Sequence, residues 1–112
     1  MPSDTPLEIE CATVAERLGS STPLVLIDCR EPDEHALARI EGARLVPMSE
    51  LASRLDELAA FRDQPLVVHC HHGGRSLTVA RWLREQGFAQ VQSMSGGIDA
   101  WSQTIDPAIP RY

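Results

Sequence analysis

Two short apolar runs constrain the fold of this chain more than any other feature. They are PLVLID, Pro23 to Asp28, and PLVVH, Pro65 to His69. Both have the length of a strand and lack the polar alternation of a strand with one face in water, so they are typical of strands covered on both faces. Because helical patterns alternate with these strands, the sequence predicts an α/β fold, a parallel sheet with helices on both faces. Periodicity leaves the order of the strands open.

The other elements follow from apolar spacing and from stop signals. We expect helices within residues 12–19, 31–42, 50–61 and 76–87, and two further strands within 43–47 and 89–97. Pro32 suits the first turn of the second helix, and Ser49 is expected to cap the third. Gly19 and Gly87 follow the last apolar positions of the first and fourth helices and predict where these helices end.

Charge and composition exclude several classes of function. The 112 residues are expected to form one domain, residues 1–112, with a single core. The net charge is −6 and all ten basic residues are arginines, a balance that argues against nucleic acid as a partner. The N-terminal segment MPSDTPLEIE lacks the cationic start and apolar run of a signal peptide, and no later stretch has membrane-spanning length. We therefore expect a cytoplasmic protein without a membrane partner, whose three cysteines are reduced thiols.

The second apolar run leads directly into the segment VVHCHHGGRS, Val67 to Ser76, which predicts a reactive cysteine. Cys70 would lie at the carboxyl end of a buried strand, with a helix starting near Arg75 or Ser76. Open α/β sheets carry their ligand and catalytic sites at such strand-to-helix turns. Cys70 is therefore a candidate nucleophile.

Several features around this cysteine favour its thiolate, which is the nucleophilic form. Gly73 and Gly74 are expected to take backbone angles that other residues avoid, so that successive N–H groups form an anion cradle. The helix start adds unpaired N–H donors and the positive end of its dipole. Arg75 supplies a permanent cation, and His71 and His72 add partial positive charge near neutral pH.

Two other interpretations compete with an activated cysteine. A cysteine after a strand is commonly a small buried hydrophobic residue, but the glycines, the arginine and the helix start disfavour that role for Cys70. The run HCHH suggests a metal site, yet consecutive residues on a tight turn do not easily converge on one tetrahedral ion. We expect no metal. Cys29 is expected to be a packing cysteine rather than a redox partner of Cys70, and Cys11 to be incidental.

Three segments resemble the signature regions of rhodanese-type sulfurtransferase domains, in the same order and spacing. They are LIDCREPDEHALARIEGARLVP, VVHCHHGGRS and SGGIDAW, and the resemblance extends from about Leu7 to Trp101. It implies a rhodanese-like fold of five parallel strands, with a core at about residues 7–101 and a C-terminal tail, residues 102–112. It also implies an enzyme that needs no cofactor. Its cysteine takes a sulfane sulfur from a donor, becomes a persulfide and passes the outer sulfur to a thiophilic acceptor.

The resemblance assigns roles to individual residues. The nucleophile is Cys70. Binding of the persulfide and of the donor's anionic group falls on the five residues that follow it: His71, His72, Gly73, Gly74 and Arg75. Support of the loops beneath the site falls on four more residues: Asp28, Arg30, Glu34 and Ser76.

The sulfur donor stays open, because the loop HHGGR matches neither of two known patterns. The best-known thiosulfate enzymes carry two basic residues in this loop, and mercaptopyruvate enzymes carry a small Cys-Gly-Ser/Ala-Gly loop. We expect a small donor such as thiosulfate or glutathione persulfide. The tail resembles the end of rhodanese domains fused to adenylating enzymes, which suggests a sulfur-accepting protein as a further partner.

Two other functions compete with sulfur transfer. Cysteine phosphatases and arsenate reductases use a similar loop but place five residues between cysteine and arginine, whereas four separate Cys70 from Arg75. The smaller ring of N–H groups suits a persulfide sulfur better than a tetrahedral phosphate. A non-catalytic module that relays persulfide or senses redox state through Cys70 is the second alternative, because fold alone does not exclude it.

Overall fold

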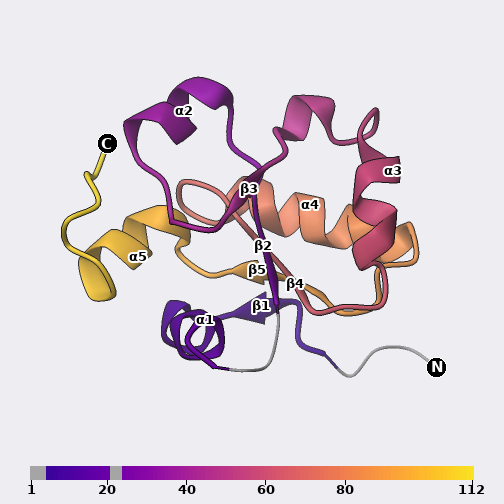
Figure 1. Cartoon of the computed structure of the whole chain (residues 1–112), viewed down its shortest axis with the longest axis horizontal. Helices are drawn as coiled ribbons and strands as arrows, with labels where there is room; N and C mark the ends of the chain where they lie inside the picture. The colour runs from indigo at the N-terminus through magenta and orange to yellow at the C-terminus, as the bar shows by residue number, and fades with distance from the viewer. Residues whose placement is uncertain (1–4, 21–23) are drawn as a thin grey trace.

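A five-stranded parallel sheet forms the centre of the computed structural model, which describes residues 5–20 and 24–112 (Figure 1). Along the sheet the strands run in the order β1, β5, β4, β2, β3. Their bounds are β1 (Glu8–Ile9), β2 (Val25–Asp28), β3 (Arg44–Leu45), β4 (Leu66–His69) and β5 (Val91–Met94). The predicted α/β fold with a parallel sheet is therefore confirmed. Pro23, expected to begin the second strand, lies outside the described residues.

The central strands are buried as their apolar sequences predict. Every residue of β4 and β5 is buried, and in β2 only Val25 is partly exposed. Val25 pairs with Leu66 and Asp28 pairs with His69, so β2 and β4 run side by side and end together. Because parallel strands end at the same edge of a sheet, the residues that follow these two strands meet there.

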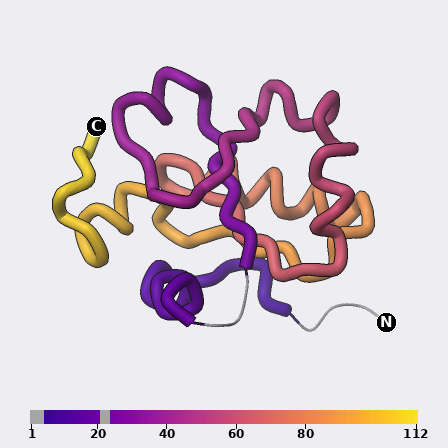
Figure 2. Tube along the Cα trace, viewed as in Figure 1, coloured from indigo at the N-terminus to yellow at the C-terminus, as the bar shows by residue number. Residues whose placement is uncertain are grey.

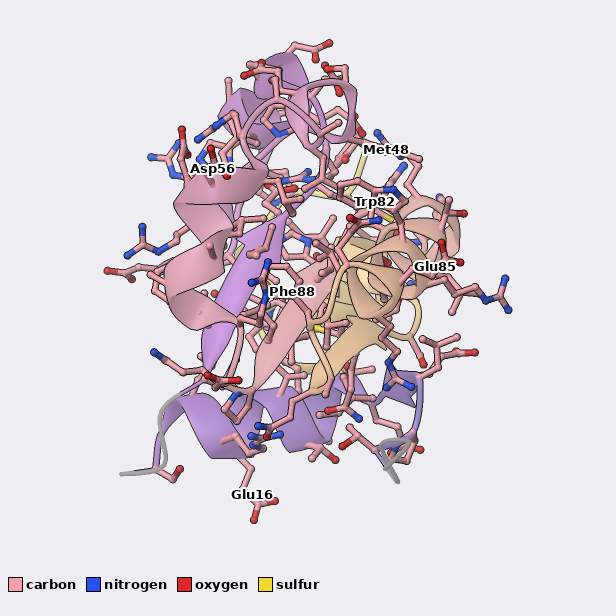
Figure 3. All side chains as sticks on the ribbon, turned by 90° about the vertical axis from the view of Figure 1, so that its right-hand side faces the viewer. Glu16, Met48, Asp56, Trp82, Glu85 and Phe88 are labelled. Atoms are coloured by element: carbon pink, nitrogen blue, oxygen red, sulfur yellow. The ribbon has the colours of Figure 1, made fainter. Side chains whose placement is uncertain are left out.

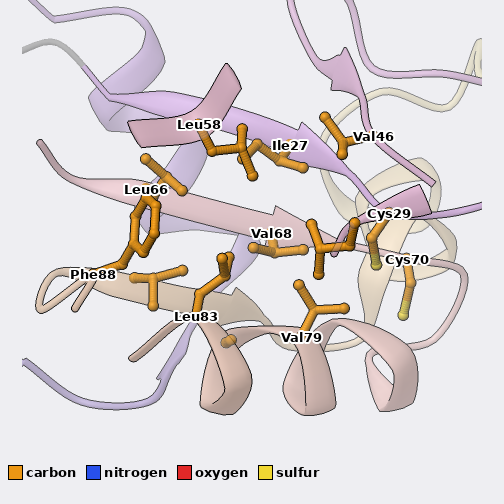
Figure 4. Close-up of a cluster of buried hydrophobic side chains, with 13 residues drawn as sticks. Ile27, Cys29, Val46, Leu58, Leu66, Val68, Cys70, Val79, Leu83 and Phe88 are labelled. Atoms are coloured by element: carbon orange, nitrogen blue, oxygen red, sulfur yellow. The ribbon is translucent and has the colours of Figure 1, made fainter. Parts of the chain in front are cut away.

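Helices cover both faces of the sheet, as expected. Their bounds are α1 (Cys11–Leu18), α2 (Pro32–Leu37), α3 (Leu55–Leu58), α4 (Gly74–Glu85) and α5 (Gly97–Thr104). Helices α3 and α4 lie over one face, and α1 and α5 lie over the other (Figure 1). The apolar cluster between β4 and α4 includes Val68 and Leu83 (Figure 4). The cluster on the opposite face includes Val67 and Trp101.

The prediction of one helix within residues 50–61 is wrong. The segment forms two 3₁₀ turns, one before and one after α3: η1 (Met48–Glu50) and η2 (Ala59–Phe61). Ser49 caps no helix, and its hydroxyl donates a 2.9 Å hydrogen bond to the Glu31 carboxylate. Leu51 and Leu58 are nevertheless buried. The leucine spacing therefore predicted correctly which side of the segment faces the core. It did not show whether the segment is one helix or several short turns.

Two elements were not predicted from periodicity. Strand β1 has only two residues, of which Ile9 pairs with Met94, so it is too short to show a pattern; only the family resemblance implied a fifth strand. Helix α5 follows Gly96 directly and buries Ile98 and Trp101, two positions in a single turn. Strand β1 lies beside β5, and α5 follows β5 in the chain. The end of β1 and the start of α5 both lie near the carboxyl edge of the sheet.

The outer surface carries both charged side chains and an apolar pocket. Glu16 and Glu85 project away from the body of the molecule, whereas Met48 and Trp82 lie close together at the rim of an apolar pocket (Figure 3). The C-terminal segment turns back after α5 and reaches the neighbourhood of α2 (Figure 2). In the described part of the chain, no helix combines the length and apolar character needed to cross a membrane.

Candidate active site

Cys70 directly follows β4 at the buried carboxyl edge of the sheet. Its surface is 1% exposed, and the loop that leads to α4 folds over it. Val68 and Cys70 belong to the same apolar cluster, because alternate residues along an extended chain point to the same face. The thiol therefore points into the buried space between the sheet and the loop, and not into solvent.

Two backbone N–H groups donate hydrogen bonds to the Cys70 sulfur. Gly73 N lies 3.1 Å from it and Ser76 N lies 3.3 Å from it. The hydroxyl oxygen of Ser76 is 3.4 Å from the same sulfur. These donors belong to the loop and to the first turn of α4, where backbone N–H groups have no partner inside the helix. The arrangement stabilises negative charge on the sulfur.

The two loop glycines differ in backbone conformation. Gly73 has a φ of +109°, which favours glycine, and a Cβ there would also lie 3.3 Å from the Gly96 nitrogen. Gly74 has helical angles and begins α4, with nothing within 4 Å of the position of a Cβ. The expectation of an unusual backbone angle at Gly74 is therefore wrong, because the helix starts at Gly74 rather than near Arg75 or Ser76 as predicted.

Ser76 is anchored from below by a second serine. The Ser76 and Ser93 hydroxyl oxygens lie 2.7 Å apart, and Ser76 also donates to the carbonyl of Gly73 at 3.2 Å. Both serines are buried. Since Ser93 lies on β5, the sheet itself fixes the orientation of the Ser76 side chain beside the sulfur.

Cys29 occupies the position after β2 that Cys70 occupies after β4. The Cys29 N–H donates to the His69 carbonyl at 3.0 Å, which continues the parallel ladder by one residue beyond the pair of Asp28 and His69. Both cysteine side chains lie at the same end of the buried cluster, next to each other (Figure 4). Cys29 is fully buried, as expected of a packing cysteine, but its packing partner includes the candidate nucleophile.

These surroundings lower the pKa of Cys70 to about 4. The largest cause is the hydrogen bond from the Cys29 thiol. Burial opposes it, and the Ser76 hydroxyl and the N–H groups of Ser76 and Gly73 add to the lowering. The hydrogen bond to Cys70 also raises the pKa of Cys29 far above its ordinary value, with burial acting in the same direction. The pair therefore shares one proton and carries one negative charge, centred on Cys70.

The start of α5 holds the carbonyl side of the loop. Ile98 N–H donates to the Cys70 carbonyl at 2.9 Å, and Asp99 N–H donates to the His71 carbonyl at 3.1 Å. Gly97 has a φ of +61°, and a Cβ there would overlap both of these carbonyl groups. The loop N–H groups can face the sulfur because N–H groups of helix α5 bind the loop carbonyl groups on the opposite side.

Arg75 lies in the first turn of α4 with its guanidinium turned toward Glu34. Its NH1 and NH2 groups donate to the two carboxylate oxygens at 2.7 and 2.8 Å. The Tyr112 hydroxyl donates to the same carboxylate at 2.8 Å. Chiefly through Arg75, these bonds lower the pKa of Glu34 to about 2. The cation predicted to attract the donor is thus paired with a carboxylate, and its role in donor binding stays a prediction.

Asp28 and Arg30 form a buried ion pair beneath the loops. Arg30 donates from Nε at 2.9 Å and from NH2 at 2.7 Å to the two Asp28 oxygens, and both side chains are fully buried. Burial alone would raise the pKa of Asp28, but the bonds from Arg30 and His35 lower it below its ordinary value. Arg30 also donates to the Tyr112 hydroxyl at 2.7 Å. The pair connects the end of β2 to the C-terminal segment, a bracing position.

His71 and His72 lie at the outer side of the loop. The His71 ring stacks on Tyr112 with centroids 3.9 Å apart, and the His72 ring lies 3.9 Å from that of His71. The two rings therefore lie together. With Asp99 they bring three possible metal-ligating atoms within 4.8 Å. The same carboxylate accepts a 2.9 Å bond from Arg111, whose charge opposes a cation there.

Three site residues were missing from the sequence prediction or given another role. Cys29 had a partial signal, because it and Cys70 each directly follow an apolar run; that the two strands are neighbours is visible only in the structure. Ser93 and Tyr112 had none, since each reaches the site only through tertiary folding from a distant segment. The other predicted residues all lie in or directly beneath the loop.

Comparison with known proteins gives a consistent result for the sequence. The rhodanese-like domain family matches residues 10–104. The chain is 33% identical over 96 residues to a sulfurtransferase of Allochromatium vinosum, covering 86% of this chain and 88% of that protein. It is 37% identical over 85 residues to the thiosulfate sulfurtransferase GlpE of Ectopseudomonas mendocina, covering 76% of each.

Other relatives are longer proteins that carry a similar segment. The chain is 38% identical over 89 residues to the chloroplastic rhodanese-like/PpiC domain-containing protein 12 of Arabidopsis thaliana, covering 78% of this chain. It spans only 30% of the length of that relative.

Solved structures agree with the fold. The human single-domain sulfurtransferase TSTD1 superposes with a TM-score of 0.76 at 28% identity, covering 88% of this chain and 97% of that one. A rhodanese-related protein of Thermoplasma volcanium gives a TM-score of 0.80 at 27% identity, covering 96% and 100% of the two chains.

Proposed function

This chain belongs to the rhodanese-like domain family, and we propose that it is a sulfurtransferase that carries sulfur as a persulfide on Cys70. The observation that carries the proposal is the hydrogen bonding of the Cys70 sulfur. A buried sulfur that accepts bonds from two loop N–H groups and has a pKa of about 4 is a thiolate at neutral pH. Such a thiolate is ready to attack a sulfur donor.

The proposed reaction has two steps with thiosulfate as donor. The Cys70 thiolate attacks the outer sulfur of thiosulfate, a new S–S bond forms, and the donor's S–S bond breaks with its electron pair leaving on sulfite. A thiophilic acceptor such as cyanide then attacks the outer persulfide sulfur. The persulfide bond breaks, and its electron pair returns to Cys70 as the thiolate. The N–H groups of Gly73 and Ser76 offset negative charge at the start and end of this cycle.

The orientation of Arg75 favours sulfur transfer over phosphate ester hydrolysis. A phosphatase needs an arginine that binds the phosphate oxygens through its paired N–H groups. Here both terminal nitrogens of Arg75 are bonded to Glu34, and only four residues separate Arg75 from Cys70. The loop that surrounds Cys70 is short, and its arginine is bonded to Glu34 instead of facing the cysteine. Such a loop suits a single sulfur atom better than a phosphate group.

For the donor we propose a small anionic sulfane compound, such as thiosulfate or glutathione persulfide, and a sulfur-accepting protein as a possible physiological acceptor. A reducing compartment such as the cytoplasm suits a protein whose Cys11, Cys29 and Cys70 are all unpaired. A relay module that never turns over small donors is the alternative that the same geometry permits.

The test is a turnover assay with thiosulfate and cyanide, read as thiocyanate and sulfite, together with intact mass after thiosulfate alone. We expect catalytic thiocyanate formation and a mass gain of one sulfur atom, which maps to Cys70. A mass gain without turnover would identify a relay. Hydrolysis of an aryl phosphate at a comparable rate, without sulfur uptake, would refute the proposal in favour of a phosphatase.

A further inference from the structure

The sheet places Cys29 and Cys70 as neighbours in its ladder. Val25 N–H donates to the Pro65 carbonyl where Val25 pairs with Leu66. Cys29 N–H donates to the His69 carbonyl in the same way, so the register continues and Cys29 stands opposite Cys70. Neighbouring strands in a sheet lie roughly 4.8 Å apart. That spacing falls within the range of about 4.4–6.8 Å between the Cα atoms of disulfide-bonded cysteines.

Both thiols also lie on the same face of the sheet, and both are shielded from solvent. Cys29 is 0% exposed and Cys70 is 1% exposed, and both belong to the apolar cluster under α4 (Figure 4). The loop N–H groups of Gly73 and Ser76 approach the Cys70 sulfur from α4 and its preceding loop, whereas Cys29 approaches it from β2. A sulfur atom on Cys70 therefore has a second thiol beside it before any acceptor arrives.

From this juxtaposition we propose a second activity: Cys29 resolves the Cys70 persulfide into a Cys29–Cys70 disulfide and releases hydrogen sulfide. The step rests on the proposed persulfide chemistry. The Cys29 sulfur attacks the inner sulfur of the persulfide, a bond between Cys29 and Cys70 forms, and the bond to the outer sulfur breaks. The outer sulfur leaves with the electron pair as hydrosulfide and takes up the proton that Cys29 gives up. The outer sulfur is reduced and the two cysteines are oxidised, so no external oxidant is needed.

The hydrogen bond between the cysteines makes the step conditional on sulfur loading. While Cys70 is a thiolate, that bond and burial hold the Cys29 proton in place, which keeps Cys29 unreactive. Loading replaces the charge on the inner sulfur with a covalent bond. The largest cause that keeps Cys29 protonated is then removed, and the Cys29 proton can pass to the outer sulfur as the Cys29–Cys70 bond forms. A dithiol reductant, which opens disulfides through a mixed disulfide, completes the cycle by returning both thiols.

The experiment follows the fate of the loaded sulfur without any acceptor. The reduced full chain is treated with sodium thiosulfate under anaerobic conditions, the donor is removed, and intact mass and dissolved sulfide are followed with time. In the parent protein we expect the mass gain of one sulfur atom to be replaced by the loss of two hydrogen atoms, with one sulfide released for each persulfide lost. Peptide mapping should find Cys29 linked to Cys70, and dithiothreitol should restore the reduced mass.

Two variants and one control identify the attacking thiol. Cys29→Ser, whose hydroxyl is still able to donate to the Cys70 sulfur, and Cys29→Ala should both retain the added sulfur and release no sulfide. Cys11→Ser is the matched control, because Cys11 is also a buried cysteine but lies in the cluster on the opposite face. It should behave as the parent does.

The outcomes separate this inference from the proposed function. If the parent protein keeps its persulfide as long as Cys29→Ser does, Cys29 is a packing residue, and sulfur transfer through Cys70 stands without it. If neither the parent protein nor the Cys29 variants ever gain sulfur or release sulfide, the persulfide proposal itself fails and the inference fails with it.

Discussion

Two strand-to-helix connections in this molecule each hold a buried cysteine, but the pKa values of the two thiols are shifted in opposite directions. Cys11 begins α1 shortly after β1, and Cys70 precedes α4 directly after β4. Both are buried cysteines at the carboxyl edge of one sheet, between a strand and a helix. On sequence position alone the two thiols are nearly equivalent.

The backbone around each sulfur separates them. The Cys11 sulfur lies near carbonyl oxygens, 3.6 Å from that of Ser95 and 3.9 Å from that of Gly97. Burial raises the pKa of Cys11, whereas the pKa of Cys70 falls because a thiol and backbone N–H groups donate to it. A strand-to-helix turn is therefore not enough to activate a cysteine. The groups that face the sulfur decide whether it is charged: the Cys29 thiol and backbone N–H groups at Cys70, and carbonyl oxygens at Cys11.

Removing the sulfur at each of these two connections should give the largest contrast. Cys70→Ser is expected to reduce thiocyanate formation and sulfur uptake to background, because a serine hydroxyl is not ionised under these conditions. Cys11→Ser should retain most of the activity, since the Cys11 sulfur bonds to the carbonyl groups of Ser95 and Gly97 and not to the Cys70 sulfur. Thiosulfate turnover and intact mass measure both variants. Substantial turnover by Cys70→Ser would contradict the mechanism.

Disturbing the backbone behind the loop should come next in size. Gly97→Ala places a Cβ against the Cys70 and His71 carbonyls at a positive φ, so we expect a loss of about 1–3 kcal/mol in unfolding free energy together with most of the activity. Gly42→Ala is the matched control. Gly42 also has a positive φ, but the space around its Cβ position is open.

Urea denaturation and thiosulfate turnover give the two readouts for this pair. Gly42→Ala should lose stability by about 1 kcal/mol and keep its activity per folded molecule. Equal activity in both variants would show that α5 does not set the loop geometry.

The pH dependence should distinguish the two cysteines in one protein. Because the pKa of Cys70 is lowered to about 4, its thiolate is fully formed at neutral pH, and protonation sets in only as the pH falls toward that value. The rate of sulfur uptake from thiosulfate should therefore gain nothing from cysteine ionisation between about pH 6 and 8. Cys11, with a raised pKa, should stay protonated and unloaded over the same range. A rate that rises tenfold for each pH unit would mean that Cys70 is a thiol at rest.

Weakening one donor should shift the titration of Cys70 by a smaller amount. Ser76→Ala removes the hydroxyl beside the sulfur, and we expect the pKa of Cys70 to rise by about one unit or less, since the N–H donors and Cys29 remain. Ultraviolet absorbance of the thiolate against pH measures the shift. Thr78→Ala, on the same helix with its hydroxyl bonded to the Gly74 carbonyl, should leave the titration unchanged.

The smallest expected effect tests whether Arg75 attracts the donor. Glu34→Gln removes the negative charge paired with Arg75, so a donor-binding Arg75 should lower the KM for thiosulfate by a factor of about two to five, as expected of a partly exposed ion pair. An uncharged donor should show no such gain. If both donors bind more weakly, the pair only braces the loop.

The fold class could be predicted from the sequence because strands buried on both faces consist of consecutive apolar residues. The apolar runs that begin at Leu24 and Leu66 have the length of a strand and no polar alternation, which is typical of strands covered on both faces. The leucines at Leu51 and Leu58 also marked the buried side correctly. They did not distinguish one helix from a series of short turns, because both bury residues at similar spacing.

The candidate site was predictable only where neighbours in sequence are neighbours in space. The loop from Cys70 to Ser76 is such a segment, and its glycines and helix start pointed to the thiolate. The contact with Cys29 depends on the register of two strands, and the contacts of Ser93 and Tyr112 depend on the folded chain. Parallel strands are joined through long connections, so a single sequence carries no local sign of which residues they bring together.

The hydrogen bonds from Ile98 and Asp99 to the Cys70 loop make the chemistry depend on a late segment of the chain. During synthesis, β2 and β4 leave the ribosome well before α5, and β1 has no partner until β5 follows it. A nascent chain that has exposed Cys70 but not residues 97–104 lacks the hydrogen bonds that hold the carbonyl groups of the Cys70 loop. The sulfur uptake proposed for Cys70 would therefore depend on completion of the C-terminal part of the fold, which supplies the last contacts of its loop.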